Sequence, residues 1–349
     1  MTHYVGVDLH RRRSVIVVLD ADGAELWVHR IDNDPVTLGL EIEAAGPEPE
    51  VVLEATWGWY WAADVITEAG GRVHLAHPLG IAGFENRRVK NDRIDARLLA
   101  DLLRMGRLPE AWIPPESVRH QRELVRYRRK LSQLRAGLKA QVHSVLGKEG
   151  LLPPINHLWG PGGSAWLDET DMAEAYETRV RSLRRLIKLY DTEIVKLDAR
   201  VAAEFKGHVG YEAIQAIHGV GPVLGATFTA ELGDVTRFKS TKHVCSWAGL
   251  PPRHRESDTK VYRGSITKQG PPLVRWAAIE AVSKNHGGDP IKDLASQQLG
   301  KFSRSSTTGY VMVRSGASLR PRQRDWRTRS GDCELEIGMA PHCGRGRLM

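Results

Sequence analysis

The first third of the chain alternates between short apolar runs and amphipathic stretches, a pattern typical of a domain that mixes strands and helices. Apolar runs that are rich in β-branched residues and bounded by turn residues indicate strands, and Asp22-Gly23 is a hairpin signal between two of them. Stretches with apolar residues at every third or fourth position indicate helices. The predicted order is strands at 4–8, 14–19 and 25–31, a helix at 36–45, a strand at 50–55, a helix at 59–69 and a strand at 72–76.

A further helix is predicted next, and its first turn carries two acidic residues, Asp92 and Asp95. Residues three apart on a helix share one face at about 5–6 Å, so the two carboxylates repel each other unless solvent or a cation separates them. The ordinary alternative is that both acids complement the positive end of the helix dipole. The pair alone does not decide between these interpretations.

This order of elements is that of the ribonuclease H-like fold, so we predict an α/β domain of that class over residues 1–113. In this fold the first and fourth strands are parallel neighbours, and their carboxyl ends lie side by side at one edge of the sheet. Asp8 and Glu54 occupy those two ends. The helix with Asp92 and Asp95 would pack across the sheet and bring its acids to the same place.

Four converging carboxylates would repel one another strongly without divalent cations. Two Mg²⁺ ions roughly 4 Å apart would make a phosphodiester-cleaving centre, because they polarise the phosphate and stabilise both the entering and the leaving oxygen. Each acid has an ordinary alternative, since Asp8 could cap a turn and Glu54 could pair with an arginine. Together the pattern predicts Asp8, Glu54, Asp92 and Asp95 as catalytic residues and metal ligands.

Charge is distributed unevenly along the 349 residues, whose net charge is +8 and whose pI is about 9.4. The first 112 residues hold twelve Lys and Arg against eighteen Asp and Glu. Residues 117–150 and 236–275 each hold nine basic residues against two acidic ones. The split predicts acid chemistry in the first part of the chain and polyanion binding behind it.

Cysteine use and hydropathy bear on the compartment. Three cysteines, Cys245, Cys333 and Cys343, have neither disulfide-framework nor metal-ligand spacing, which favours a reducing cytosol. No apolar run approaches 18 residues, and no signal peptide is apparent. We therefore expect a cytoplasmic, nucleoid-associated prokaryotic protein without a membrane partner.

Beyond residue 114 the pattern changes to long helices, which predicts a coiled-coil helical linker over residues 114–205. Its first helix, at 117–148, carries arginines on the faces away from its apolar positions. We expect these arginines to lie along a nucleic-acid backbone. The predicted contacts are Arg119, Arg122, Arg126 and Arg129.

Residues 151–167 are rich in Gly and Pro and are predicted to form a loop. Apolar residues then recur by three and four over 180–201, as in a coiled-coil seam. The linker could be a hairpin that only spaces two domains, a nucleic-acid surface or a dimer contact. The sequence leaves open whether the seam closes within one chain or between two.

Residues 206–300 are predicted to form a mainly α C-terminal domain. Gly219-Val220-Gly221, between two helical patterns, resembles a helix-hairpin-helix turn, in which the following helix offers N–H groups to a phosphate; a packing turn is the alternative. Basic, glycine-containing segments follow and suit phosphate contacts. The nucleic-acid-binding residues predicted here are Arg253, Arg255, Lys260, Arg263 and Lys268.

These pieces together resemble the transposases of the insertion-sequence "one-ten" group, also called DEDD transposases, which are relatives of the Piv-type DNA invertases. The resemblance runs in family order from about residue 4 to 285. The matching segments are GVD at 6–8, LEAT at 53–56, KNDRIDA at 90–96, IHGVGP at 217–222, FKS at 238–240 and GLPPR at 249–253, followed by Ser257.

The resemblance implies a RuvC-like catalytic domain, a coiled-coil linker and a C-terminal transposase domain. It also implies a noncoding bridge RNA that pairs with donor and target DNA, and homodimers or homotetramers with composite sites. The same resemblance makes Ser257 the nucleophile, which would attack the DNA phosphate and form a phosphoserine intermediate. From its neighbours alone, Ser257 is an ordinary surface-loop serine.

The last segment, 301–349, departs from the family pattern, since it has little periodicity and many Arg, Gly and Ser residues. It is either a basic arm that orders on nucleic acid or the product of a shifted reading frame. The second possibility keeps open a non-catalytic, RNA-binding remnant of a decayed element. Two further rivals are a metal-dependent, RuvC-like junction-resolving nuclease and a sugar-kinase or actin-like ATPase, whose fold also suits Val5-Gly6-Val7-Asp8.

Overall fold

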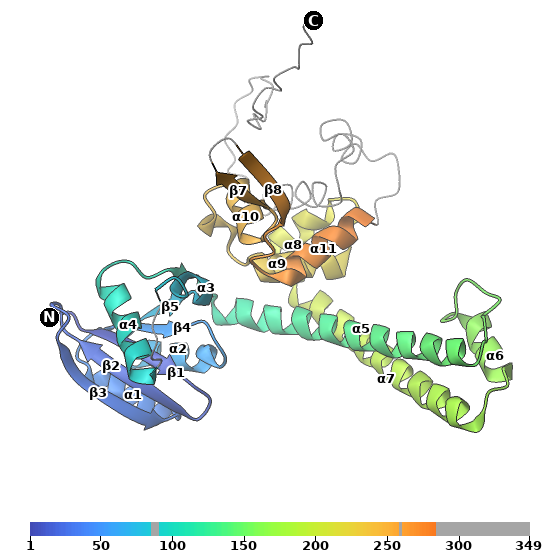
Figure 1. Ribbon diagram of the computed structural model, residues 1–349, viewed down its shortest axis with the longest axis horizontal. Helices are drawn as coiled ribbons and strands as arrows, with labels where there is room; N and C mark the ends of the chain where they lie inside the picture. The colour runs from blue at the N-terminus through green and yellow to red at the C-terminus, as the bar shows by residue number, and fades with distance from the viewer. Residues whose placement is uncertain (85–90, 258–259, 284–349) are drawn as a thin grey trace, which may run out of the picture. The chain divides into compact units, whose positions relative to one another are not determined.

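The computed structural model describes residues 1–84, 91–257 and 260–283, which fall into two compact units divided between Glu116 and Ser117. The first unit is built on a mixed six-stranded sheet with the strand order β3-β2-β1-β4-β5-β6 (Figure 1). The strands are β1 (Tyr4–Leu9), β2 (Arg13–Leu19), β3 (Glu25–Asp32), β4 (Glu50–Glu54), β5 (Arg72–Ala76) and β6 (Glu110–Ala111). The first five strands are confirmed, while the two-residue β6 carries too little pattern to be predicted.

β1 lies at the centre of this sheet, antiparallel to β2 and parallel to β4. The predicted neighbourhood of the first and fourth strands is therefore confirmed. β1 and β4 are in register from Tyr4 opposite Glu50 to Val7 opposite Leu53, so the residues that follow, Asp8 and Glu54, come level at the same edge.

Helices cover both faces of the sheet, which explains why β2 is apolar at nearly every position. They are α1 (Pro35–Ala44), α2 (Trp59–Glu68), α3 (Pro78–Ile81) and α4 (Asp92–Arg104). On one face, Val7 and Ile16 pack with Ile42 of α1 and Ile66 of α2. On the other face, residues of β2 that alternate with these pack against Ala96 and Ala100 of α4.

The second unit contains a long helical hairpin, made of α5 (Glu116–Lys148) and α7 (Glu174–Glu204) with the short α6 (Pro161–Glu169) between them. Val142 and Val145 of α5 pack against Leu183 and Ile187 of α7. Two ion pairs also join the helices, Arg128 with Asp198 at 2.7 Å and Arg135 with Asp191 at 2.5 Å. The predicted seam thus closes within one chain here, and Figure 1 shows the two helices running side by side.

The prediction of a loop over 151–167 is wrong in its second half, because α6 begins at Pro161. Proline suits the first helical position, where its missing N–H would have no partner anyway. Gly163 lies so close to the backbone of Leu158 that a Cβ there would be 2.1 Å from the Leu158 carbonyl oxygen. Gly163 therefore serves tight packing at the hairpin tip, although the number of glycines suggests a loop.

The rest of the second unit has its own core, which includes Phe228, Val244 and Val274. Its elements are α8 (Val209–Gln215), α9 (Pro222–Leu232), the 3₁₀ turn η1 (Val235–Arg237), α10 (Thr241–Trp247), the hairpin strands β7 (Pro252–Ser257) and β8 (Lys260–Ile266), and α11 (Pro272–Ser283). The domain is mainly α as predicted, with one β-hairpin added.

The glycine turn between α8 and α9 is present, and Gly219 adopts a left-handed φ of 83°. A Cβ at Gly219 would lie 2.2 Å from the carbonyl oxygen of Ala281 in α11, so this glycine allows two backbones to meet. Packing explains Gly219, and the phosphate-binding role of the turn stays a prediction.

The linker and the C-terminal helices, expected as separate domains, fall within one compact unit. The predicted boundaries after residues 113, 205 and 300 stay predictions, and the tail at 301–349 lies outside the described residues. The helices of the described residues include none with both the length and the hydropathy of a membrane span.

Candidate active site

Gly6 allows the helix that carries two of the acids to lie directly on the central strand. A Cβ at this position would be 1.9 Å from the carbonyl oxygen of Ala96 and 3.0 Å from the backbone nitrogen of Ala100. A side chain larger than hydrogen would therefore push α4 off β1. The glycine two residues before Asp8 sets how near the acids of α4 come to that carboxylate.

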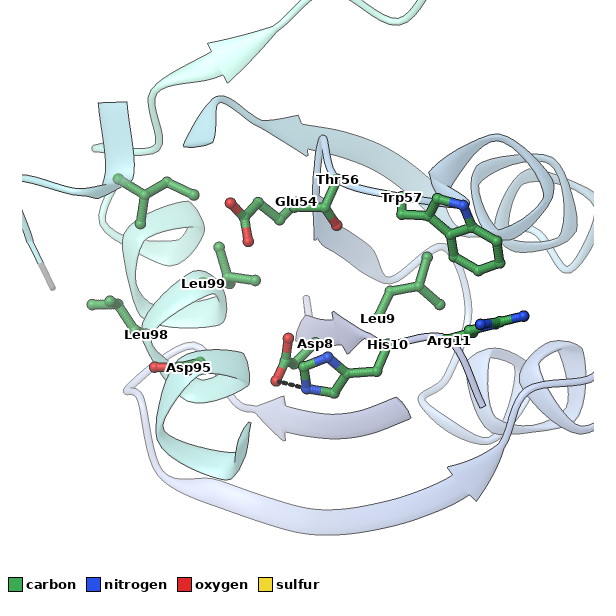
Figure 2. Close-up of a pocket in the computed structure, with 11 residues that line it drawn as sticks. Asp8, Leu9, His10, Arg11, Glu54, Thr56, Trp57, Asp95, Leu98 and Leu99 are labelled. Carbon is green, nitrogen blue, oxygen red and sulfur yellow. Dashed lines mark ion pairs between the residues drawn. The ribbon is translucent and has the colours of Figure 1, made fainter. Parts of the chain in front are cut away.

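Three of the four predicted acids line one pocket of about 680 Å³. Asp8 comes from β1, Glu54 is the last residue of β4, and Asp95 lies in the first turn of α4. Figure 2 shows Asp8 and Glu54 at the edge of the sheet where β1 and β4 end, with Leu99 of α4 beside them, whereas Asp95 and Leu98 extend from α4 away from the two strand ends. The strand ends and the helix therefore contribute to one pocket as expected, and the catalytic and metal-binding roles of these three residues stay predictions.

Asp92, the fourth acid, does not line the pocket but is linked to it through His10. Nε2 of His10 lies 3.1 Å from Oδ2 of Asp8 and 3.5 Å from Oδ1 of Asp92. Arg30 on β3 donates a hydrogen bond of 3.0 Å to the other oxygen of Asp92. The guanidinium of Arg30 offsets part of the repulsion between the acids.

Asn91 fixes where this acidic helix begins. Its side chain accepts a hydrogen bond of 3.0 Å from the backbone N–H of Arg93, which is an N-cap. Asp92 and Asp95 then fall in the first helical turn, so they also complement the helix dipole. The ordinary and the functional interpretation of this pair are therefore both compatible with the same geometry.

The donor set fits a divalent cation. One ligand atom from each of Asp8, His10 and Asp92 can be chosen so that all three lie within 4.8 Å of one another. Carboxylate oxygens are the preferred ligands of Mg²⁺ and Mn²⁺, and an imidazole nitrogen adds affinity for Mn²⁺ and later transition metals. Asp8, His10 and Asp92 could hold such an ion, and Glu54 and Asp95, which are not part of this group, stay predicted ligands.

Besides apolar lining residues, sequence reasoning missed four polar or aromatic residues of the pocket, namely His10, Arg11, Thr56 and Trp57. Each follows Asp8 or Glu54 by two or three residues. That offset from Asp8 or Glu54 is the signal that could have identified them, because the first residues after neighbouring parallel strands share one edge of a sheet.

Two arginines of α5 are buried, so the expectation that they lie on its outer face is wrong. Arg119 and Arg122 are 8% and 9% exposed. Arg122 donates hydrogen bonds to the carbonyl oxygens of Ala230 at 3.0 Å and Glu231 at 2.8 Å. These carbonyls belong to the last turn of α9 and have no partner within the helix, so the guanidinium caps them.

The neighbouring arginines on α5 also contact protein. Arg126 forms a two-pronged ion pair with Glu231, at 2.7 and 2.9 Å. Arg129 lies over the ring of Trp276, 3.7 Å from its centroid, and burial lowers the pKa of its guanidinium. Arg237 shares this crowded region, where burial and the charge of Arg122 lower its pKa to about 10. Nucleic-acid contacts by these arginines stay a prediction.

Ser257 is the last residue of β7 and is exposed, opposite Lys260 at the end of the β-hairpin. Arg253 and Lys268 are also exposed. Arg255, Lys260 and Arg263 lie on the hairpin strands, but their side chains are outside the described structure. Ser257 and the acids belong to different units, so their meeting in one site stays a prediction.

The loop before and after the hairpin is tightly held. Gly249 and Gly270 have positive φ angles of 69° and 125°. A Cβ at Gly249 would lie 2.2 Å from the Gln269 carbonyl oxygen, and one at Gly270 would lie 2.0 Å from that of Trp247. Lys268 donates its backbone N–H to Gly249 at 3.0 Å. The base of the hairpin is therefore fixed by direct contact between backbones.

Comparisons with known proteins match both units. Residues 5–149 match the DEDD transposase family model, described as a transposase, and residues 211–286 match the model described as a transposase of the IS116/IS110/IS902 family. These two regions take up more than half of the chain and define it as a transposase. The chain belongs to the IS110 family, and because a transposase moves DNA, DNA is a substrate.

Individual relatives agree with this assignment. The chain is 27% identical over 286 residues to a putative transposase, y4qE, of Sinorhizobium fredii, covering 79% of this chain and 70% of the relative. It is 24% identical over 289 residues to the transposase for insertion sequence element IS1111A of Coxiella burnetii, with coverage of 79% and 75%. A mini-circle putative transposase for IS117 of Streptomyces coelicolor is 25% identical over 332 residues, with coverage of 76% and 80%.

Proposed function

We propose that this transposase is an RNA-guided DNA recombinase, which cleaves and rejoins DNA strands with carboxylate-bound divalent cations and a serine nucleophile. The observation that carries the proposal is the convergence of Asp8, Glu54 and Asp95 in one pocket. Oxygen donors of this kind suit Mg²⁺, the cofactor we propose. A ribonuclease H-like, RuvC-like origin for the first unit agrees with its order of strands and with the parallel pairing of β1 and β4.

The carboxylates position the reacting phosphate. Bound divalent cations would supply Lewis-acid polarisation of the phosphate and stabilise charge on the entering and leaving oxygens. Asp8 and Glu54 extend from neighbouring parallel strands, and Asp95 and Asp92 come from a helix held against β1 at Gly6. Three rigid elements therefore hold the ligand set, which is the arrangement that preorganised catalysis requires.

Ser257 would carry the covalent step. Its hydroxyl oxygen attacks phosphorus and loses its proton to water, a new Oγ–P bond forms, and the bond between phosphorus and the leaving strand breaks as that oxygen gains a proton. Attack by the hydroxyl of another strand reverses the step and frees the serine. No external energy source is needed, because one phosphodiester replaces another.

A noncoding bridge RNA would choose the DNA by pairing with both donor and target. Exposed basic residues of the C-terminal domain, such as Arg253 and Lys268, suit backbone contacts with these polyanions. Because Ser257 and the acids lie in different units, a dimer or tetramer with composite sites is part of the proposal.

Strand exchange with the purified full-length chain, its flanking noncoding RNA, donor and target duplexes and Mg²⁺ tests the function. We expect joined DNA products and, on a denaturing gel, a protein–DNA adduct that Ser257→Ala abolishes. RNA binding without any DNA cleavage or joining would contradict the proposal.

One observation favours a second candidate, a RuvC-like nuclease that resolves junctions with the acids alone. All four acids belong to one compact unit, whereas Ser257 lies in the other. The two functions differ in the Ser257→Ala variant, since a nuclease of this kind would keep cutting and would form no adduct in any variant.

A further inference from the structure

The pocket that holds the acids has a second end whose residues the carboxylate chemistry does not use. Trp57, Thr56 and Arg11 line it together with Asp8, Glu54 and Asp95. Figure 2 shows Trp57 and Arg11 at the end away from α4, beyond Leu9. A volume of about 680 Å³ is in the range of pockets that bind small organic ligands, so cations at the acids would fill only part of it.

Trp57 leaves a large aromatic surface in water. The residue is 69% exposed, although Trp59 and Trp61, two and four residues later, pack against the core of the sheet. Exposing an indole costs free energy that burial would recover, because aromatic side chains carry much of the stabilisation in cores and interfaces. An exposed indole inside a pocket is therefore suited to a ligand with a flat face.

The backbone fixes the place of Trp57 relative to the acids. The N–H of Thr56 donates to the carbonyl oxygen of Glu54 at 2.7 Å, so the chain turns directly after β4. Gly58 then adopts a left-handed φ of 79° as the residue directly before α2. Trp57 is held between these two constraints, three residues from a predicted metal ligand.

Arg11 supplies a positive charge at the same end. It follows His10 after β1 and is exposed. Within residues 1–84, 91–257 and 260–283 no ion pair involves Arg11, whereas Arg13, two residues on, pairs with Asp32 at 3.1 Å. An aromatic face and an arginine in one pocket are the groups that bind a nucleotide, through its base and its phosphate.

We propose that this end of the pocket is a nucleotide subsite, in which Trp57 stacks on a base next to the scissile phosphate and Arg11 binds a flanking phosphate. The proposal rests on the proposed function, because it takes the acids as the place of strand cleavage. Stacking tolerates any base, since every base has a π-face. The subsite therefore sets the position of the strand and leaves the choice of sequence to other contacts.

The test uses the full-length chain and a fluorescently labelled single DNA strand from the end of the element. Affinity is measured by anisotropy without divalent cations, so that no strand is cut. Trp57→Ala should weaken binding roughly 5- to 150-fold, the range for one stacked base, and Trp57→Phe should retain most of the affinity. Thermal unfolding checks that each variant is folded.

An abasic nucleotide is then moved along the strand. At one position it should abolish the difference between the wild-type chain and Trp57→Ala, because the stacked base is missing for both. Tyr60→Ala, at an aromatic residue of α2 outside the pocket lining, should bind each strand as the wild type does. An equal loss for Trp57→Ala on every abasic strand, or no loss on the intact strand, would overturn the proposal.

Arg11 is tested against its neighbour Arg12, which is exposed but does not line the pocket. Arg11→Ala should reduce the slope of log affinity against log salt by roughly 0.7, the value for one phosphate contact on a single strand. Arg12→Ala should leave the slope unchanged, and equal effects of the two would overturn the role of Arg11. Cleavage by an Asp8→Asn chain would instead contradict the proposed function and leave the stacking result standing.

Discussion

The acid pocket of the first unit and the arginine cluster of the second, which comprises Arg122 and Arg126 of α5, concentrate charge in opposite ways. Around the pocket, Asp8 and Asp92 are brought near each other, with His10 between them and the charge of Arg30 as partial compensation. In the second unit, Arg122 and Arg126 meet carbonyl oxygens and the buried carboxylate of Glu231. The difference is that the arginines find their counter-charges within the chain, whereas gathered acids at a pocket gain most from an added cation.

The largest effect is expected where the pocket loses a ligand. Asp8→Asn keeps the shape of the side chain but removes its charge, so strand cleavage should fall by more than about 100-fold. Single-turnover cleavage measures the loss. Asp22→Asn, at an exposed turn of the same unit, is the matched control, and similar cleavage by both variants would show that Asp8 is an ordinary surface acid.

A substitution at Gly6 tests whether the acids depend on the contact between β1 and α4. Gly6→Ala forces the helix away from the strand and should lower the free energy of unfolding of the first unit by about 3 kcal/mol. Gly39→Ala in α1 is the control, because its new Cβ would lie 3.8 Å from Val65 and should be neutral or slightly stabilising. Urea unfolding of both variants makes the comparison, and equal stabilities would contradict the tight contact.

A substitution in the arginine cluster should change the free energy of unfolding. Arg122→Ala leaves two buried carbonyl oxygens without their donor, so the free energy of unfolding of the second unit should fall by about 1–3 kcal/mol. Arg185→Ala, at an exposed arginine of α7, should change it little. If Arg122→Ala instead unfolds like the wild type but binds nucleic acid with a weaker salt dependence, the result would support the predicted contact of Arg122 with a nucleic-acid backbone.

The smallest effect is expected for a substitution of His10. It shows whether His10 coordinates the cation or only pairs with the acids. His10→Ala should weaken Mn²⁺ binding by roughly tenfold, because it removes a nitrogen donor next to the carboxylates. Calorimetric titration of the full-length chain measures it, with His29→Ala as the control outside the pocket. Tighter binding after the change would mean that His10 competes with the cation.

The sheet and its acids could be predicted because both depend on local pattern. The apolar runs end at Asp8 and Glu54, and parallel pairing places strand ends together whatever surrounds them. The arginines of α5 could not be placed in the same way. Arg126 and Glu231 are separated by 105 residues, and the helical period of α5 gives no sign of a partner so far along the chain.

Trp57 shows a second limit of local pattern. Trp57, Trp59 and Trp61 alternate along five residues, yet two of them pack on the core and one faces the pocket. The turn at Gly58 makes this difference, because the residues before it belong to the strand end and those after it to α2. Neither the composition nor the spacing of the three indoles indicates which one is exposed.

The approach of Ala96 to Gly6 is a contact between two main chains, with no rotamer in between. The placement of Asp92 and Asp95 relative to Asp8 is therefore insulated from the gradual turnover of core side chains that accompanies divergence among related elements. A lineage could exchange most of its valines and isoleucines and still inherit the same distances, as long as one hydrogen atom stays where a methyl group would not fit.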